Sequence, residues 1–516
     1  MTLQPEATTR NLLRPRLIPF LAVALLACFA VVQLQNWPER LRYPGEEDAV
    51  EGTQLSEMVH LRRGVQIYRL PSSGEFDGAI YGPLCYLLGA VVINPNHPSY
   101  APLRMLSLAA TLGLAVASGW LAFRLTRRRI AGVLAVSLLF ATAFVGRYGI
   151  SARADMVALL LAFAGFLIFY NFRDSRRALI FSAALLSLSF FYKQQFLGAP
   201  GAIFAYLVID KRYRQGLEFL CAIIAGDLIL AGAFSFLIFP HQAFLQHFIA
   251  YNRLPFDESN LLPEILMFSI PLFIPLLGSI DFLAEHPDKL VGCYVAVSVC
   301  SYFLLLFSSG SGADTNRCLE PLLVLTCVFA ARVATSDGII PGLGWTAPLA
   351  ATLVLVSFLS FAFVVPHVSP SDFAADATLQ SYLQENFSPH SSALAYYAGD
   401  PIRAGLDAPI TNWWGYTALI RKGVLSDREI VSRIDNGGYG VILLDFDLER
   451  FNASKMADFY TTRPMRNAVL RGYQQVARLN LPRPETSRFT DGSVYVWVPK
   501  SRIVTQHNAN ETGGQN

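Results

Sequence analysis

Residues suited to chemistry gather between Tyr43 and Tyr86, directly after the first strongly apolar segment of the chain. Its first half places several carboxylates close to where a membrane surface would lie: Glu46, Glu47, Asp48, Glu51 and Glu57. A carboxylate there can take a proton from a hydroxyl group or help to hold a metal ion. Glu51 also begins a helical pattern, so the same acids could simply complement the dipole at a helix N-terminus.

Four later groups of polar residues interrupt apolar runs, where ionisable side chains are costly and by default functional. They are Arg147, Arg153 and Asp155 in RYGISARAD; Lys193 and Gln194 in FFYKQQF; His241 and His247; and Arg317 with Glu320 in GADTNRCLEP. A lysine suits a phosphate, and a histidine could join a first-loop carboxylate on a metal ion. Interfacial anchoring, helix capping and simple ion pairing explain the same residues without catalysis.

The composition indicates a membrane protein. The 516 residues are 53% hydrophobic and only 15% charged, and the mean hydropathy is +0.39. Soluble proteins carry about 25% charged residues, and apolar runs of roughly 20 residues are typical of membrane spans. Cysteines occur only in or near apolar segments and show no metal spacing, so no disulfide framework is expected. P-loop, nucleophile-elbow and zinc-finger spacings are absent from the sequence.

We predict an α-helical polytopic membrane protein with about eleven transmembrane helices. The spans are 17–35, 103–123, 131–146, 155–171, 178–192, 196–209, 217–239, 262–283, 289–307, 318–334 and 345–366. The apolar piece 79–93 is short and contains glycine and proline, so it is predicted to be an interfacial or re-entrant helix. The first apolar run lacks a clean small-residue cleavage site and is expected to remain as a span.

The short loops alternate in charge when 79–93 is not counted as a span. Arginine and lysine clusters at 10–16, 124–129, 173–177 and 211–214 then fall on one side. The positive-inside rule makes that side cytoplasmic. Residues 1–16 are therefore expected in the cytoplasm, and the first loop, 36–102, outside it.

The chain changes character after Pro366. Helical spacing at Phe373–Phe387 and Asp427–Ile434 alternates with strand patterns at Ala393–Ala398, Gly440–Phe446 and Ser493–Val498. This alternation predicts a small extracytoplasmic α/β domain over 367–500, after the transmembrane part, 17–366. Residues 501–516 are polar and expected to be disordered.

The ordered motifs resemble the GT-C superfamily of polyprenyl-phosphate-sugar-dependent glycosyltransferases. The bacterial relatives of protein O-mannosyltransferases and lipid A aminoarabinose transferases are the most similar group. The resemblance rests on Glu51, Gly52, Gly64 and Tyr68 at the spacing EG-x11-G-x3-Y, then YGPLCYLL from Tyr81, GRYGISARAD, FFYKQQF and GADTNRCLEPLL. These motifs follow the family's order and cover roughly residues 15–335. The family often has a lysine before the proline of the first-loop helix, whereas here Gly82 precedes Pro83.

The resemblance implies a site and a reaction. A sugar is transferred from a polyprenyl-phosphate carrier to an acceptor hydroxyl with inversion, and some relatives use a divalent metal ion. It implies Glu51 as the general base with Asp48 in reserve, and Asp155 as a further catalytic-site residue that, with Arg153, shapes the acceptor or metal site. It also implies donor-phosphate contacts from Lys193, Arg153 and Arg317; substrate contacts from Tyr81, Gln194 and Glu320; and His247 as a metal ligand.

The expected partners are the lipid-linked donor, membrane lipids and an envelope glycan, lipid or protein acceptor at the outer face of the cytoplasmic membrane; nucleic acid is not expected. A hexose and a pentose donor fit equally well. A lipid or polysaccharide transporter is the rival class, but it would carry polar residues at mid-membrane in broken helices. A catalytically inactive glycan-binding membrane protein is the third alternative.

Overall fold

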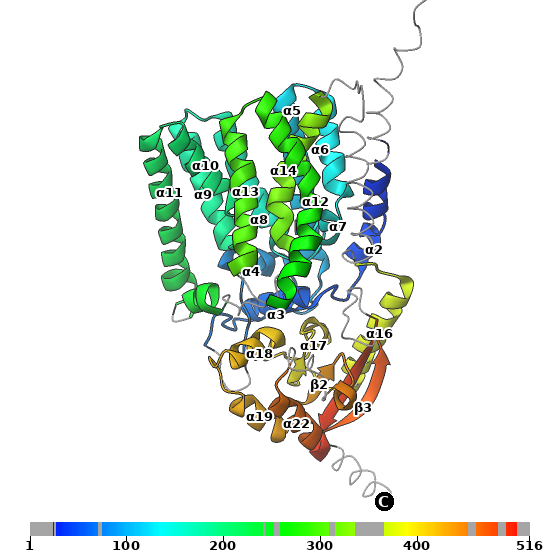
Figure 1. Cartoon of the computed structure of the whole chain (residues 1–516). Coiled ribbons are helices and arrows are strands. Elements are labelled where there is room, and N and C mark those ends of the chain that lie inside the picture. The colour runs from blue at the N-terminus through cyan, green and yellow to red at the C-terminus, as the bar shows by residue number, and fades with distance from the viewer. Residues whose placement is uncertain are drawn as a thin grey trace, which may run out of the picture.

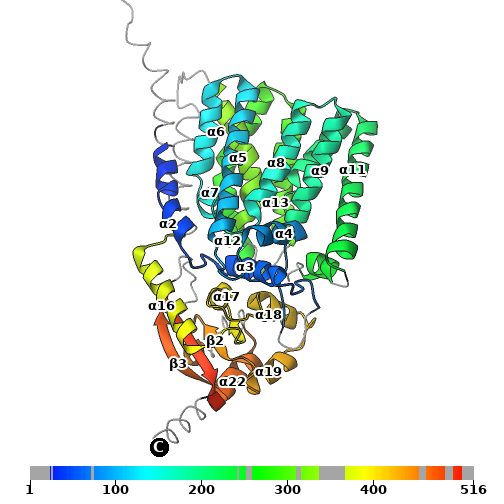
Figure 2. The ribbon, with the colours of Figure 1, turned by 180° about the vertical axis from the view of Figure 1, so that it is seen from behind.

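The computed structural model describes residues 24, 27–70, 75–240, 243–251, 258–308, 315–335, 366–451, 461–482 and 492–502. Long helices run side by side in one layer of the molecule, and short helices and a small sheet lie beyond one end of them (Figures 1 and 2). All seven cysteines are free thiols in the structure.

After the first loop, the helix bundle continues with α5. Its elements are α5 (Ala101–Thr126), α6 (Arg129–Ala141), α7 (Ala143–Tyr148), α8 (Asp155–Asn171), α9 (Arg176–Tyr192), α10 (Gly198–Ile209), α11 (Tyr213–Gly232), η1 (Ala233–Ile238), η2 (Gln246–Tyr251), α12 (Glu258–Glu285), α13 (Lys289–Ser308), η3 (Thr315–Cys318) and α14 (Leu319–Thr335). Within the described residues, four helical stretches are long and apolar enough to cross a membrane: Ala101–Thr126, Tyr213–Ile238, Lys289–Leu306 and Asn316–Thr335.

Every predicted span from 103 to 334 is helical in the structure, and one of them is divided into two helices. The predicted span 131–146 is two helices, because Thr142 takes an extended conformation that ends α6 and caps α7. The predicted span 345–366 lies outside the described residues apart from Pro366, and 17–35 lies partly outside them.

Burial separates central from peripheral helices. In the most apolar 18-residue stretch that includes α14, 83% of the residues are buried, whereas only 6% are buried in that of α11 and η1. Figure 1 accordingly shows α11 at the edge of the bundle. Leu228, Ile229, Phe236 and Leu237 expose most of their apolar surface there, as expected of side chains that face lipid.

The first loop forms three short helices at one end of the bundle: α2 (Trp37–Arg42), α3 (Ala49–Arg62) and α4 (Pro83–Val92). With 10 residues, α4 is about 15 Å long, half of the roughly 30 Å needed to cross the hydrocarbon core. It therefore fits the interfacial helix predicted at 79–93. Residues 51–60 of α3 are all buried, because α3 lies between the bundle and the C-terminal region.

The C-terminal region builds a four-stranded sheet with helices around it. Its elements are α16 (Pro370–Asn386), β1 (Ala393–Ala395), α17 (Gly399–Arg403), α18 (Trp413–Arg421), α19 (Arg428–Asp435), β2 (Val441–Leu444), α20 (Leu448–Phe451), α22 (Arg463–Gly472), β3 (Tyr473–Asn480) and β4 (Ser493–Pro499). The strand order is β1-β2-β4-β3; β1 and β2 are parallel, and the other pairs are antiparallel.

Three strands and two helices lie where the sequence pattern predicted them, and β3 was missed. Its sequence, YQQVARLN, is polar because it forms an edge strand with mostly exposed side chains. The C-terminal region also touches the first loop through a parallel bridge between Phe76 and Ile410. This contact holds the C-terminal region against the end of the bundle that carries α3.

Candidate active site

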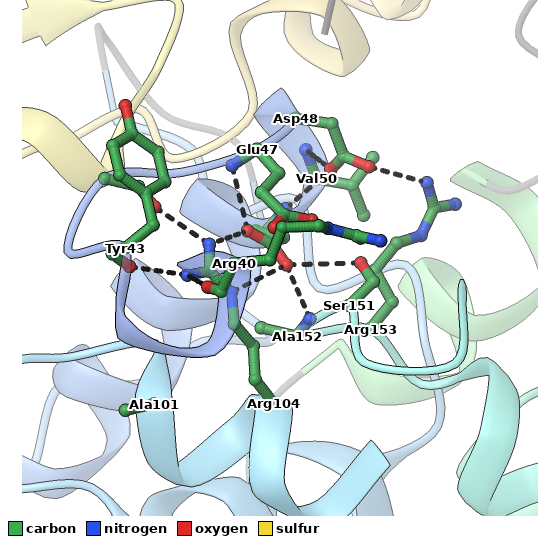
Figure 3. A network of polar contacts seen from close by, with 12 residues as sticks. Arg40, Tyr43, Glu47, Asp48, Val50, Ala101, Arg104, Ser151, Ala152 and Arg153 are labelled. Atoms are coloured by element: carbon green, nitrogen blue, oxygen red, sulfur yellow. Dashed lines mark hydrogen bonds and ion pairs between the residues drawn. The ribbon is translucent and has the colours of Figure 1, made fainter. Parts of the chain in front are cut away.

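Asp48 is held at the N-terminus of α3 with one carboxylate oxygen directed away from the helix. Its Oδ1 accepts hydrogen bonds from the backbone N–H groups of Val50 (2.9 Å) and Glu51 (3.0 Å), which is the usual geometry of a helix N-cap. Its Oδ2 accepts from Nη1 of Arg153 at 3.0 Å (Figure 3). The cap therefore orients Asp48 toward the loop that precedes α8.

Arg153 continues from Asp48 into a chain of alternating charges. Its Nε lies 3.4 Å from Oδ2 of Asp155, and Nζ of Lys193 donates to Oδ1 of Asp155 at 2.5 Å. Nζ of Lys193 also lies 4.8 Å from the centre of the Tyr81 ring, a cation–π contact. We call Asp48, Tyr81, Arg153, Asp155 and Lys193 the charged cluster. The fold thus joins five predicted site residues from separate segments.

The charged cluster is almost entirely buried. Asp48 and Arg153 are 6% exposed, Lys193 is 4% exposed, and Asp155 is fully buried. Two acids and two bases balance one another, which offsets the cost of burying each charge. Burial also raises the pKa of the Tyr81 phenol, and the nearby charge of Arg153 partly offsets this rise. The hydroxyl therefore stays protonated at neutral pH.

Glu51 faces the bundle, and both of its carboxylate oxygens are occupied. Oε1 accepts from the backbone N–H of Ala152 (2.6 Å) and from Oγ of Ser151 (3.2 Å). Oε2 accepts from Nη2 of Arg104 (2.7 Å) and from the backbone N–H of Glu47 (2.9 Å). Nε of Arg104 adds a fifth donor, to Oε1 at 3.4 Å, and five donors on a fully buried carboxylate leave Glu51 more constrained than Asp48.

Glu320, predicted to contact substrate, joins two helices of the bundle. Its carboxylate accepts from the backbone N–H groups of Gly198 (2.9 Å) and Ala199 (2.8 Å), in the first turn of α10. A Cβ atom at Gly198 would lie 2.7 Å from the Glu320 carboxyl carbon, so this close approach requires glycine. In the structure Glu320 caps α10.

Gln194 and Arg317 also hold segments together. Nε2 of Gln194 donates to the backbone oxygens of Ile80 (3.3 Å) and Phe248 (3.0 Å), next to the Tyr81 loop. Nη1 of Arg317 donates to the backbone oxygen of Leu305 at 2.9 Å. Gln194 therefore lies near the charged cluster, and Arg317 binds the end of α13.

His247, the predicted metal ligand, lies between two backbone carbonyl groups. Its Nε2 is 2.7 Å from the oxygen of Arg69, and its Nδ1 is 3.2 Å from the oxygen of Gly78. Burial lowers the pKa of the ring, and the contacts with the two carbonyl groups partly oppose this shift. Across the described ranges, no group of three His, Cys, Asp or Glu side chains could hold a metal ion. His247 and its neighbours therefore do not fit a metal centre, and no catalytic step is assigned to one. His241 lies outside the described residues.

Three residues were not predicted from the sequence: Arg40 and Arg104 as buried charges, and Glu57 as a group with a shifted pKa. Arg40 and Arg104 are among the largest fully buried side chains. Arg104 lies within the predicted span 103–123, and an ionisable residue inside a span was the signal that could have found it. Burial raises the pKa of Glu57 to about 8. A small cavity beside Arg153 is lined by Gln54, Met58, Leu103, Ser107 and Tyr192 among others.

The fold is similar to that of solved structures from the superfamily that the motifs resemble. The chain is similar to ArnT from Cupriavidus metallidurans in the apo state, with a TM-score of 0.55 at 12% identity, covering 82% of this chain and 93% of ArnT. For ArnT bound to undecaprenyl phosphate, the TM-score is 0.54 at 12% identity, with 93% and 97% covered. The apo Archaeoglobus fulgidus oligosaccharyltransferase gives 0.49 at 10% identity, with 93% and 76% covered. The sequence matches no protein-family model and no curated protein.

Proposed function

We propose that this chain is an integral membrane glycosyltransferase that moves a sugar from a polyprenyl-phosphate carrier to an acceptor hydroxyl. The observation that carries the proposal is the charged cluster, in which a loop carboxylate and two cations meet at one end of the bundle. Similarity in fold to ArnT, which has been captured with undecaprenyl phosphate, supports this donor class.

In the proposed reaction Asp48 is the general base. Its Oδ2 accepts one hydrogen bond, from Arg153, whereas Glu51 is saturated by five donors. Asp48 takes the proton of the acceptor hydroxyl, and the hydroxyl oxygen attacks the anomeric carbon. The bond from that carbon to the phosphate oxygen breaks, and its electron pair leaves with the lipid phosphate. Attack opposite the leaving group inverts the anomeric configuration.

The cations of the charged cluster stabilise the phosphate that leaves. Lys193 and Arg153 carry fixed positive charges in a nearly dry site, where electrostatic stabilisation is strong. Asp155 contacts both cations and orients them. Tyr81 and Gln194 line the sugar side of this site, and Arg317 is proposed as a further phosphate contact.

The acceptor would be an envelope glycan, lipid or protein at the outer face of the cytoplasmic membrane. Arg124, Arg127 and Arg128 lie at the C-terminal end of α5, and Arg104 and the first loop lie at its other end. The positive-inside rule therefore favours a cytoplasmic N-terminus and an extracytoplasmic α3. Cysteine labelling at Thr126 and Ser381 should occur from opposite sides; labelling of both from one side would contradict this topology.

A transporter is less well supported. The charged cluster lies at one end of the bundle, on the side of α3 and α4, and not along its middle. A transport site would instead be expected near the midplane, where it can open to either side.

The proposal can be tested with the full chain in lipid nanodiscs. Undecaprenyl phosphate should bind to the wild type, and Lys193→Met should weaken this binding at least tenfold. Asp48→Asn should bind the same lipid but transfer sugar from a radiolabelled lipid-linked pool at least about 100-fold more slowly. Asp210→Asn is the matched control, because Asp210 pairs with Lys289 away from the charged cluster. Full transfer by Asp48→Asn would refute the assigned base.

A further inference from the structure

Two arginines hold the loop that carries Asp48 against the bundle. Arg40 lies in α2, Arg104 lies in the first turns of α5, and both side chains are fully buried. A buried guanidinium is tolerated only when charge and hydrogen bonds compensate for its lost hydration. The partners of these two side chains therefore define where the loop can lie.

Arg104 binds the loop at several points. Its Nη1 donates to the backbone oxygens of Arg40 (2.8 Å) and Tyr43 (2.5 Å), and its Nη2 donates to that of Gly45 (2.8 Å). Nη2 also donates to Oε2 of Glu51 at 2.7 Å (Figure 3). One planar guanidinium from the bundle thus fixes the loop on both sides of Asp48.

Arg40 adds a second ion pair, directly before Asp48 in the chain. Its Nε and Nη2 donate to the two carboxylate oxygens of Glu47 at 2.8 and 2.6 Å. Nη2 also donates to the backbone oxygen of Arg147, and Nη1 to that of Gly146. Because the N–H of Glu47 donates to Oε2 of Glu51, the two ion pairs form one frame around Asp48.

Glu51 also reaches the segment that carries the partner of Asp48. Its Oε1 accepts from Ser151 and Ala152, directly before Arg153. The Glu51 carboxylate thus positions Asp48 through α3, and it positions Arg153 through the loop that precedes α8. A shift of about 1 Å between reacting groups can cost about 100-fold in rate.

We propose that Glu51 and Arg104 are positioning residues, which hold Asp48 and Arg153 in register for transfer, and that Glu51 does not itself take the proton. This inference rests on the proposed function and revises the role that the sequence resemblance implied for Glu51. It predicts that variants of the pair lower the rate without removing the base.

The decisive readout is the pH dependence of sugar transfer by the full chain in nanodiscs. Glu51→Gln should lower kcat about 10- to 100-fold, while the acid limb of the pH–rate profile, which reports the base, stays in place. Arg104→Met should lower kcat at least as far, and Arg104→Lys should recover part of the loss. Loss of the acid limb in Glu51→Gln would overturn the proposal, and so would full activity in Arg104→Met.

A milder variant keeps the test valid if Glu51→Gln does not fold. Ser151→Ala removes one donor to Glu51, at 3.2 Å, and leaves every charge in place. It should lower kcat several-fold, leave undecaprenyl phosphate binding and the acid limb unchanged, and keep the wild-type melting temperature within a few degrees. An unchanged kcat would overturn the positioning role. Failure of the proposed function itself would look different, since the wild type would then transfer no sugar.

Discussion

Nζ of Lys193 lies 2.5 Å from Oδ1 of Asp155, although 38 positions separate the two residues in the chain. Asp155 is the first residue of α8, and Lys193 is the cap that follows α9. The two helices pack against each other, and Oγ of Ser189 in α9 donates to the backbone oxygen of Ala158 in α8 at 2.7 Å. An antiparallel helix pair therefore brings a carboxylate and an ammonium group together at one end of the bundle.

Removal of one partner from this buried pair should be strongly destabilising. Lys193→Met leaves a buried carboxylate with less compensation, which costs about 3–5 kcal/mol. The double variant Lys193→Met/Asp155→Asn should regain most of the lost melting temperature, because neither charge remains, but should not regain undecaprenyl phosphate binding. Thermal unfolding and lipid binding in nanodiscs measure the two effects. Recovery of lipid binding in the double variant would contradict the phosphate role of Lys193.

Glu57 should make the contact between α3 and the C-terminal region depend on pH. Its Oε1 accepts from the N–H of Ala79 (2.6 Å) and from Oγ1 of Thr411 (3.1 Å). Burial raises its pKa from 4.5 to about 8. The folded form therefore binds the proton more tightly, so this stabilisation is complete below pH 4.5 and is lost as pH rises through about 8.

Hydrogen exchange around Thr411 measures this effect. Protection should fall as pH rises toward 8, after correction for the intrinsic exchange rate, and Glu57→Gln should remove this dependence. Asp435→Asn is the control, because Asp435 is an exposed carboxylate of α19 that pairs with Arg471. The same pH dependence in Glu57→Gln as in the wild type would show that another group is responsible.

Gly82 should not tolerate a side chain. A Cβ atom there would lie 1.8 Å from the backbone oxygen of Phe191, and the N–H of Gly82 donates to the oxygen of Tyr192 at 3.2 Å. Gly82→Ala should force α4 away from the end of α9, destabilise the protein by about 1–3 kcal/mol and slow transfer, because Lys193 follows Tyr192. Gly292→Ala is the control, since nothing lies within 4 Å of its Cβ position. Equal melting temperatures for both variants would contradict the packing.

The C-terminal region should be needed for a correctly placed first loop. A Cβ atom at Gly399 would lie 1.8 Å from the Tyr100 hydroxyl oxygen and 3.0 Å from Cα of Gly52 in α3. Gly399→Ala should therefore displace α17 from α3 and lower both the melting temperature and the rate of transfer. Ser381→Ala, at an exposed position of α16, should change neither. A wild-type rate in Gly399→Ala would mean that α17 does not support the site.

Much of the fold could be predicted because local patterns decide it. Apolar runs long enough for a helix located the bundle elements, and the short run with Pro83 located α4. Short apolar pieces located β1, β2 and β4, whose residues are buried, but not the polar edge strand β3. Residue propensities could not predict β3, because this polar segment forms a strand through its pairing with β4.

The candidate site, like the fold, could be predicted from the sequence only in part. The sequence by itself determined which residue types stand near the ends of the spans. It selected Glu51, with Asp48 in reserve, and Arg153, Asp155 and Lys193. Only the tertiary structure decided which acid meets which base: Arg104 binds Glu51, and Arg153 binds Asp48. Helical periodicity fixes the face on which a side chain lies but not the partner across from it, and contacts between distant segments depend on how the helices pack.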